Sequence, residues 1–89
     1  MKLLEFYTNC CPQCKQQTKI LNEVEEVEIV PINCEENEEI TSKYNVRTLP
    51  TLILLNDNDE VLNTMTGITS ANILNSIISC AKEGKQWDM

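Results

Sequence analysis

The sequence predicts an α/β domain in which a four-stranded mixed sheet, with chain order βαβαββα, is flanked by three helices on its two faces. Four apolar or β-branched runs are spaced as strands, and three segments carry apolar residues at helical spacing. The pair Cys11 and Cys14 lies where the first strand gives way to the first helix. With 89 residues, 42% of them hydrophobic, and only two glycines and three prolines, the chain is long enough for one modest core. We therefore expect residues 1–89 to form one domain, with a loosely held tail from about residue 84.

The first half of the chain is predicted to form a strand, a helix and a second strand. Residues Lys2–Tyr7 are an apolar run that ends in two aromatic residues, as is typical of a strand. Residues 12–24 place apolar side chains at helical spacing, and the β-branched run at residues 27–32 predicts a second strand, parallel to the first through a right-handed crossover. Pro31 cannot donate a ladder hydrogen bond, so we expect it where none is needed.

The middle of the chain is predicted to form a short helix and a hairpin. The acidic run at residues 35–39 places negative charge in the first turn of a helix that ends near Tyr44. The continuous apolar run Thr51–Leu55 predicts a central strand. The Asn/Asp cluster at residues 56–59 predicts a turn, and residues 60–65 alternate as an outer strand, antiparallel to the one before. The cluster lacks the glycine and the distal glutamate of a calcium loop, which makes metal binding there the weaker interpretation.

The last predicted element is an amphipathic helix that ends by Gly84. Thr69 or Ser70 is expected to cap its N-terminus. Its expected apolar stripe comprises Ile73, Leu74, Ile77, Ile78 and Ala81. This stripe is what would hold the helix on the sheet.

The pair Cys11 and Cys14 is the strongest chemical signal in the chain. Two thiols at this spacing on the first turn of a helix can close into a small disulfide ring and open again. The unpaired N–H groups of a helix N-terminus favour the thiolate, which is the nucleophile in disulfide exchange. Pro12 suits the first helical position, because its missing N–H is no loss there. We expect an accessible attacking thiol at Cys11 and a shielded resolving thiol at Cys14.

Composition excludes several classes of function. Fourteen acidic and seven basic side chains give a net charge of −7, which disfavours nucleic acids and anionic membrane surfaces as partners. No apolar stretch is long enough to span a membrane, and the N-terminal run is too short for a signal peptide. The chain has no histidine, which excludes a Cys–His dyad and any metal site that contains histidine. Five cysteines, an odd number, with a C-x-x-C beside a strand–helix unit favour a reducing cytoplasm.

Three separated features, taken in order, resemble the thioredoxin superfamily over nearly the whole chain. Residues 11–14 follow a strand, residues 43–51 (KYNVRTLPT) are similar to the family segment that ends in a cis-proline opposite the active site, and Gly67 follows the last strand. The resemblance implies a thioredoxin-like fold and a cis peptide bond before Pro50; an ordinary trans proline is the alternative. The substrate groove that it implies is lined by Thr48, Leu49, Pro50 and Gly67.

Glu5 stands six residues before Cys11, where thioredoxins carry a buried aspartate that relays protons to the second cysteine. The resemblance implies that a carboxyl buried beneath the pair takes the proton from Cys14, directly or through water. The alternative is a side chain that reaches from the sheet edge into solvent. The family's lysine partner for this acid is not evident, because Pro31 stands near the matching place.

Other residues depart from the thioredoxin pattern. Cys10 replaces the tryptophan before the first cysteine, and Pro-Gln replaces Gly-Pro between the pair. Cys-Pro-x-Cys and the short chain are similar to glutaredoxins, but the glutathione signature of paired glycines and acids is missing around residues 67–69. Cys34 and Cys80 are expected to be small core residues. Cys10 is either an exposed bystander or a third redox thiol.

The resemblance implies a cytoplasmic thiol-disulfide oxidoreductase that reduces protein disulfides through the Cys11–Cys14 cycle and needs no other cofactor. Its implied partners are oxidised protein substrates and a thioredoxin reductase-like electron donor, and we expect a monomer. A glutathione-dependent glutaredoxin and a non-catalytic interaction module are the alternatives. We expect no metal, because a zinc site would need two more ligands and only Cys10, Cys34 and Cys80 remain.

Overall fold

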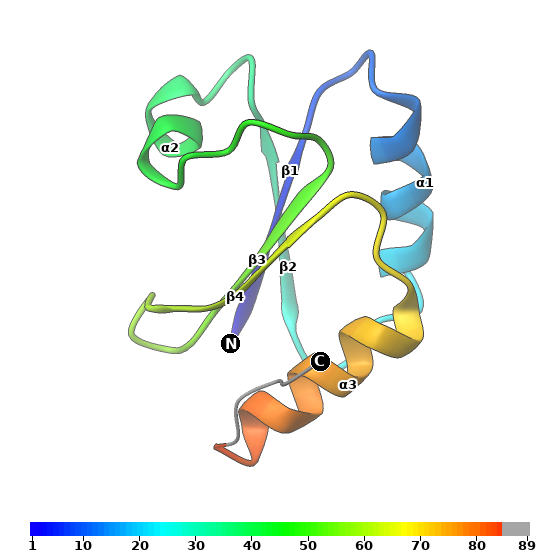
Figure 1. Cartoon of the computed structure of the whole chain (residues 1–89), viewed down its shortest axis with the longest axis vertical. Coiled ribbons are helices and arrows are strands. Elements are labelled where there is room, and N and C mark those ends of the chain that lie inside the picture. The colour runs from blue at the N-terminus through cyan, green and yellow to red at the C-terminus, as the bar shows by residue number, and fades with distance from the viewer. Residues whose placement is uncertain (85–89) are drawn as a thin grey trace.

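The computed structural model describes residues 1–84 and contains the predicted strands and helices in the predicted order. The elements are β1 (Lys2–Tyr7), α1 (Pro12–Leu21), β2 (Glu28–Asn33), α2 (Glu38–Lys43), β3 (Thr51–Leu55), β4 (Val61–Thr66) and α3 (Ala71–Lys82). The prediction of a loosely held tail concerns residues 85–89, which lie outside the described residues. The predicted fold, a four-stranded mixed sheet with three helices, is confirmed (Figure 1).

The four strands lie in the order β2-β1-β3-β4. β1 and β2 are parallel, whereas β1–β3 and β3–β4 are antiparallel pairs. All five residues of β3 are buried, as expected of a central strand, while β4 is an edge strand that begins at Val61. The mixed sheet therefore has β2 and β4 as its two edges.

Pro31 lies on the edge strand β2, opposite Glu5 of β1. The amides of Glu28 and Cys34 donate to the carbonyl oxygens of Met1, just before β1, and of Tyr7, at its end, at 3.2 and 2.9 Å. Successive amides of a strand point to opposite sides, so the amides of even-numbered residues of β2 point toward β1. The nitrogen of Pro31 therefore lies on the open side of β2. The proline thus costs the sheet no hydrogen bond, as predicted.

Two apolar cores lie on opposite faces of the sheet, because side chains alternate along each strand. Leu3 packs on the face covered by α1 and α3, in a core with Leu52 and Leu74. Leu4 and Phe6 face the other side, where α2 lies (Figure 1). There the Phe6 ring meets the Tyr44 ring edge to face, with 6.1 Å between centroids.

Helix α1 ends at Leu21, earlier than the predicted range of residues 12–24. Beyond Leu21 the amides of Glu23 and Val24 bond to carbonyl oxygens three residues back, at 3.0 and 3.1 Å. The last turn is therefore tightened, and Glu26 takes a positive φ of 67° that ends any helical continuation. Val24 is still buried in the core, so the apolar period predicted its burial correctly but not the helix end.

The short helix α2 also differs from its predicted extent, since it begins at Glu38. The preceding acidic residue Glu35 is held in a turn, where its amide donates to the Asn33 side chain at 3.0 Å. Only Glu38 and Glu39 lie in the first helical turn. The helix ends at Lys43, next to the predicted end.

The stripe predicted for α3 is wrong at one residue. Leu74, Ile77 and Ile78 are buried against the sheet, whereas Ile73 is 41% exposed. One residue of helix turns the side chain by about 100°, which takes Ile73 away from the face shared by the other three. The cap is Ser70, whose hydroxyl accepts from the Ile73 amide at 3.3 Å.

The predicted turn between β3 and β4 is present and is closed by one asparagine side chain. The Asn56 side-chain oxygen accepts from the amides of Asn58 and Glu60, each at 2.9 Å. The Met1 ammonium binds the Asp57 carboxylate at 2.7 Å. This hydrogen bond, together with the charge of the ammonium, holds the pKa of Asp57 below its ordinary value.

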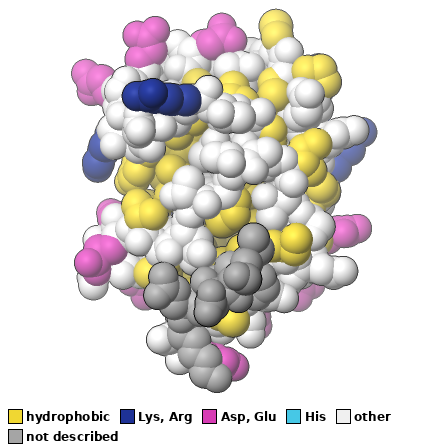
Figure 2. Space-filling model, in the orientation of Figure 1, with side chains coloured by type: hydrophobic (Ala, Val, Ile, Leu, Met, Phe, Trp, Pro, Cys, Tyr) yellow, Lys and Arg dark blue, Asp and Glu magenta, His cyan; other side chains and the backbone are white. Residues whose placement is uncertain are grey.

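The surface is acidic, with hydrophobic side chains between the charged ones. Figure 2 shows acidic side chains spread around one face and few basic ones among them. The most exposed large hydrophobic residues are Ile40, Val61, Leu62, Ile68 and Ile73. Within residues 1–84, no helix combines the length and the apolar character needed to cross a membrane.

Gln17 of α1 is a fully buried polar residue that fixes the helix to the loop after β4. Its amide nitrogen donates to the Thr69 carbonyl at 3.0 Å, and its amide oxygen accepts from the Thr69 amide at 2.8 Å. One side chain thus satisfies both backbone groups of a buried loop residue. This contact holds together two segments 52 residues apart in the sequence.

We predict that Gln17→Ala destabilises the fold by about 2–4 kcal/mol, because it leaves the buried Thr69 amide and carbonyl without partners. Urea unfolding followed by circular dichroism measures this change. Gln16→Ala is the matched control: its side chain is exposed on the same helix, and we expect a change below about 0.5 kcal/mol. Equal destabilisation by the two variants would contradict the role of Gln17.

Candidate active site

The candidate site is the disulfide at the N-terminus of α1. Cys11 has an extended backbone and caps the helix, and Pro12 is the first helical residue, as predicted. The sulfurs of Cys11 and Cys14 are bonded, with 5.2 Å between the two Cα atoms. Such a ring fits within one helical turn without displacing the backbone.

The two cysteines differ in exposure and in hydrogen bonding. Cys14 is only 2% exposed, whereas Cys11 is partly exposed. The Cys14 amide donates to the Cys11 sulfur at 3.2 Å, so one of the unpaired N–H groups of the first turn points at that atom. This geometry favours negative charge on Cys11 once the disulfide is reduced.

Three segments of the chain meet at the end of the sheet that leads to the disulfide. The pairs Phe6–Thr51 and Thr51–Thr66 align the end of β1 with the start of β3 and the end of β4. The Gly67 amide donates to the Pro50 carbonyl at 2.9 Å, which brings the segment after β4 against the segment before β3. The predicted groove residues therefore lie at the same end of the sheet as the cysteine pair (Figure 1).

The four predicted groove residues differ in exposure. The Leu49–Pro50 bond is cis, so the trans alternative is wrong. Pro50 is buried and Leu49 partly so, while Thr48 is exposed. Gly67 has a φ of +80°, a conformation that favours glycine, and a Cβ placed on it would meet no atom within 4 Å. The space next to the Gly67 Cα is therefore open.

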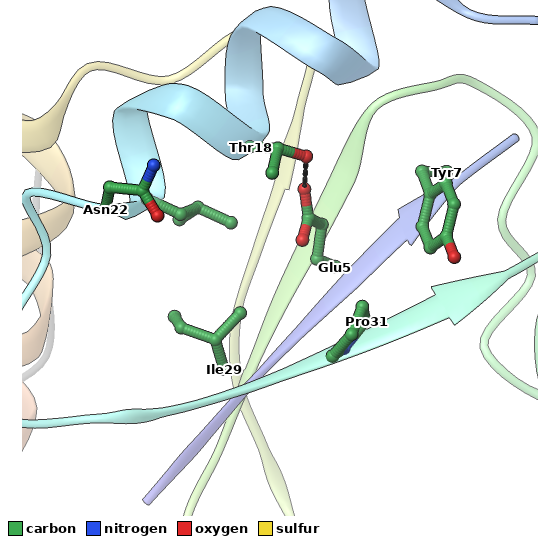
Figure 3. A pocket seen from close by; sticks show the side chains of 7 residues that line it. Glu5, Tyr7, Thr18, Asn22, Ile29 and Pro31 are labelled. Atoms are coloured by element: carbon green, nitrogen blue, oxygen red, sulfur yellow. Dashed lines mark hydrogen bonds between the residues drawn. The ribbon is translucent and has the colours of Figure 1, made fainter. Parts of the chain in front are cut away.

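Glu5 is buried, at 3% exposed, so the solvent-facing alternative is wrong. The Thr18 hydroxyl is hydrogen-bonded to its carboxyl (Figure 3) and also lies 3.0 Å from the carbonyl oxygen of Cys14. Thr18 thus connects the acid to the backbone of the second cysteine. The residue opposite Glu5 on β2 is Pro31, and no basic side chain of residues 1–84 forms an ion pair with the acid.

Two adjoining pockets lie along α1, with Tyr7 and Thr18 lining both. One, of about 510 Å³, is lined by Glu5 of β1 and Pro31 of β2 (Figure 3). The other, of about 410 Å³, reaches Cys14. The pockets provide space on both sides of Thr18 between the acid and the buried cysteine.

The structure adds Gln17 and Thr18 to the predicted residues. Both lie on the turn after Cys14, and Thr18 follows it by four residues, the spacing at which helical side chains share a face. A glutamine inside an otherwise apolar helical stripe was the available signal for Gln17. Its partner Thr69 belongs to a distant segment, and helical spacing gives no information on that contact.

The remaining cysteines form no disulfide. Cys10 is exposed beside the pair, while Cys34 and Cys80 are partly exposed. Cys34 packs against the core under α2, so it fits the prediction of a small core residue only in part. Within residues 1–84, no three His, Cys, Asp or Glu side chains are grouped to hold a metal ion.

Comparison with known proteins agrees with this geometry. The thioredoxin family model matches residues 1–79. The chain is 34% identical over 77 residues to a thioredoxin of Rickettsia bellii, covering 81% of this chain and 72% of that protein. It is 32% identical over 82 residues to the thioredoxin of Bacillus subtilis, covering 86% and 78%.

A solved thioredoxin structure has the same fold as this chain. A structure of thioredoxin-2, described as a component of malaria parasite protein secretion machinery, superposes with a TM-score of 0.81. That structure is 26% identical to this chain, and the match covers 86% of this chain and 79% of that one. Thioredoxins use no cofactor beyond their redox-active disulfide, and this chain has such a pair at Cys11 and Cys14. The chain therefore belongs to the thioredoxin family and is a thiol-disulfide oxidoreductase that acts on protein disulfides.

Proposed function

We propose that the protein reduces disulfides of oxidised proteins through a cycle of Cys11 and Cys14 and is recharged by a thioredoxin reductase. The observation that supports this most is the asymmetry of the pair, with a partly exposed sulfur at the helix cap and a buried sulfur one turn behind it. An exposed thiolate can attack a large substrate, whereas a buried thiol can react only with its neighbour.

In the first step, the Cys11 thiolate attacks one sulfur of the substrate disulfide. The bond from Cys11 to that sulfur forms as the substrate disulfide breaks, and the other substrate sulfur leaves as a thiolate that takes up a proton. The Cys14 amide, 3.2 Å from the Cys11 sulfur, stabilises the attacking thiolate. The product is a mixed disulfide between protein and substrate.

In the second step, Cys14 loses its proton and attacks the Cys11 sulfur. The mixed disulfide breaks, the substrate sulfur leaves and is protonated, and the Cys11–Cys14 bond forms. Two electrons have then passed from the protein to the substrate. A reductase returns two electrons and restores the dithiol.

Glu5 is proposed to accept the Cys14 proton through water. Its burial and its link to Thr18 support this role, as do the two pockets that adjoin at Thr18. The path must run through water because the structure gives no direct hydrogen bond from Glu5 to the sulfur. A positioned carboxyl would supply the base for the second step.

The groove is proposed to hold an extended segment of the substrate across Thr48, Leu49, Pro50 and Gly67. Thr48 is an exposed residue, and its backbone amide can pair with such a segment, as an added strand does at a sheet edge, while its carbonyl oxygen accepts from the Thr51 hydroxyl. The open side of Gly67 leaves room for it. We infer that binding in the groove places the substrate sulfur that Cys11 attacks in line with the Cys11 sulfur.

Recharging by a reductase rather than by glutathione is supported by the relatives reported above, which are thioredoxins. We further propose a cytoplasmic location, which suits the free thiols of Cys10, Cys34 and Cys80. We also propose that the protein acts as a monomer, because one chain carries both cysteines and the groove.

We predict that Cys11→Ser abolishes reduction of insulin disulfides driven by dithiothreitol, because it removes the attacking sulfur. Turbidity from the released insulin B chain measures the rate. Cys10→Ser is the matched control, one residue away and exposed, and should keep most of the activity.

Cys14→Ser should trap the substrate on Cys11 as a mixed disulfide that mass spectrometry detects. Full activity of Cys11→Ser would overturn the proposal.

We predict that Glu5→Gln slows the second step by about ten- to a hundredfold and leaves the first step unchanged, because only Cys14 needs this base. Single-turnover reaction with Ellman's reagent separates the steps in reduced protein that also carries Cys10→Ser, Cys34→Ser and Cys80→Ser, so that only the pair reacts. Attack by Cys11 then releases one thionitrobenzoate, and resolution by Cys14 releases the other. Glu28→Gln, with an exposed side chain, is the control for loss of one negative charge. An unchanged second phase, or a slowed first phase, would contradict the role given to Glu5.

A further inference from the structure

The pocket beside Glu5 has the features of a binding site separate from the disulfide. It is formed by β1, α1 and the edge strand β2, and its volume is about 510 Å³. In Figure 3 the Glu5 carboxyl lies between α1 and β2, with Asn22 and Ile29 on one side and Tyr7 and Pro31 on the other. Pro31 and Asn22 are exposed, so the pocket is open to solvent.

One oxygen of the Glu5 carboxyl has no donor. Thr18 is hydrogen-bonded to Oε2, and no residue among 1–84 donates to Oε1. Buried carboxyl oxygens are normally hydrogen-bonded or paired with a cation, because burial without a partner is costly. Glu5 is 3% exposed and lines the pocket, so this oxygen is available to a donor that enters from solvent.

The other walls indicate the chemistry of that donor. Leu21, Ile29 and Pro31 are apolar and would pack against an alkyl chain. The Tyr7 ring and the Asn22 amide also line the pocket, on opposite sides of the carboxyl, and an aromatic ring and an amide oxygen both attract a cationic group. A chain with a net charge of −7 also attracts cations and repels anions.

A bare metal ion fits these walls poorly. Metal ions that prefer oxygen take six or more oxygen ligands, whereas the pocket has one carboxyl and single side-chain oxygens from Tyr7, Thr18 and Asn22. An ammonium ion on an alkyl stem matches both parts of the pocket, since the stem contacts the apolar walls and the N–H groups reach Glu5. We propose that this pocket binds a primary alkylammonium group, with the Glu5 carboxyl as its acceptor.

Such a group has two sources, a free amine or the lysine side chain of a protein. The pocket adjoins the one that reaches Cys14, so a lysine on a protein docked at the disulfide could enter it. A free polyamine would enter from solvent. The chemistry at Glu5 is the same in both cases.

Titration of the oxidised protein with n-butylammonium chloride, followed by amide NMR, tests the proposal without any thiol chemistry. Its outcome is therefore independent of the proposed redox function. We expect saturable shifts at Glu5, Tyr7 and Asn22, a Kd raised about tenfold or more by Glu5→Gln, and no change with Glu28→Gln. Neutral n-butanol should bind at least about tenfold more weakly than the amine. Absence of saturable shifts, or equal binding of the alcohol, would overturn the proposal.

A second variant covers the case in which Glu5→Gln does not fold. Ile29→Trp fills the pocket from the partly exposed strand β2 and leaves the carboxyl in place, and it should abolish binding. Unchanged binding to this variant would place the amine elsewhere and overturn the proposal. Spermidine and N-acetyl-lysine amide then distinguish the sources: tighter binding of the first indicates a free polyamine, and tighter binding of the second a protein side chain. Binding of neither would also overturn it.

Discussion

The site depends on one interaction, the placement of the Cys11 sulfur at the unpaired N–H groups that begin α1. That placement requires an extended residue at the cap, a proline that tolerates the first helical position and a second cysteine one turn further in. It also requires that β1 deliver the chain to the end of the sheet where β3 begins and β4 ends. The two hydrogen bonds between the Gln17 side chain and the Thr69 backbone hold α1 against the segment after β4.

Two buried polar side chains distinguish the α1 face of the sheet from an ordinary apolar core. Gln17 has both its amide groups satisfied, so it stabilises and orients the fold. The Glu5 carboxyl has one oxygen hydrogen-bonded to Thr18 and one without a donor among residues 1–84. A buried carboxyl with an unpaired oxygen stabilises the fold less than a fully hydrogen-bonded one. A role in proton transfer or in binding a cation would account for a buried acid in this position. Both proposals made for Glu5 follow from this one feature.

Local patterns in the sequence predicted most of the fold. Apolar runs and turn residues predicted every strand and helix, and the resemblance to thioredoxins placed Cys11, Cys14, Pro50 and Gly67 at one end of the sheet. The helix end at Leu21 was predicted wrongly, because apolar spacing carries no information on backbone hydrogen bonds. Ile73 was wrongly placed in the buried stripe, because the spacing does not fix which side of the helix faces the sheet. The burial of Glu5 was one of two alternatives and was implied by the resemblance, because it depends on how the helix covers the strand. The partner of Gln17 depends on a contact between distant segments, which no local pattern encodes.

Competition between the two neighbouring thiols Cys10 and Cys11 tests the central claim most directly. Cys10 is the more exposed, whereas Cys11 has the helix amide at its sulfur, so exposure and electrostatics favour different residues. The measurement is limited alkylation of the fully reduced protein with iodoacetamide at neutral pH, with each cysteine located by peptide mass spectrometry. The account predicts that Cys11 is modified first, ahead of Cys10, while Cys14 stays protected. Earlier modification of Cys10 would contradict it, because the helix N-terminus would then not determine which sulfur is the nucleophile.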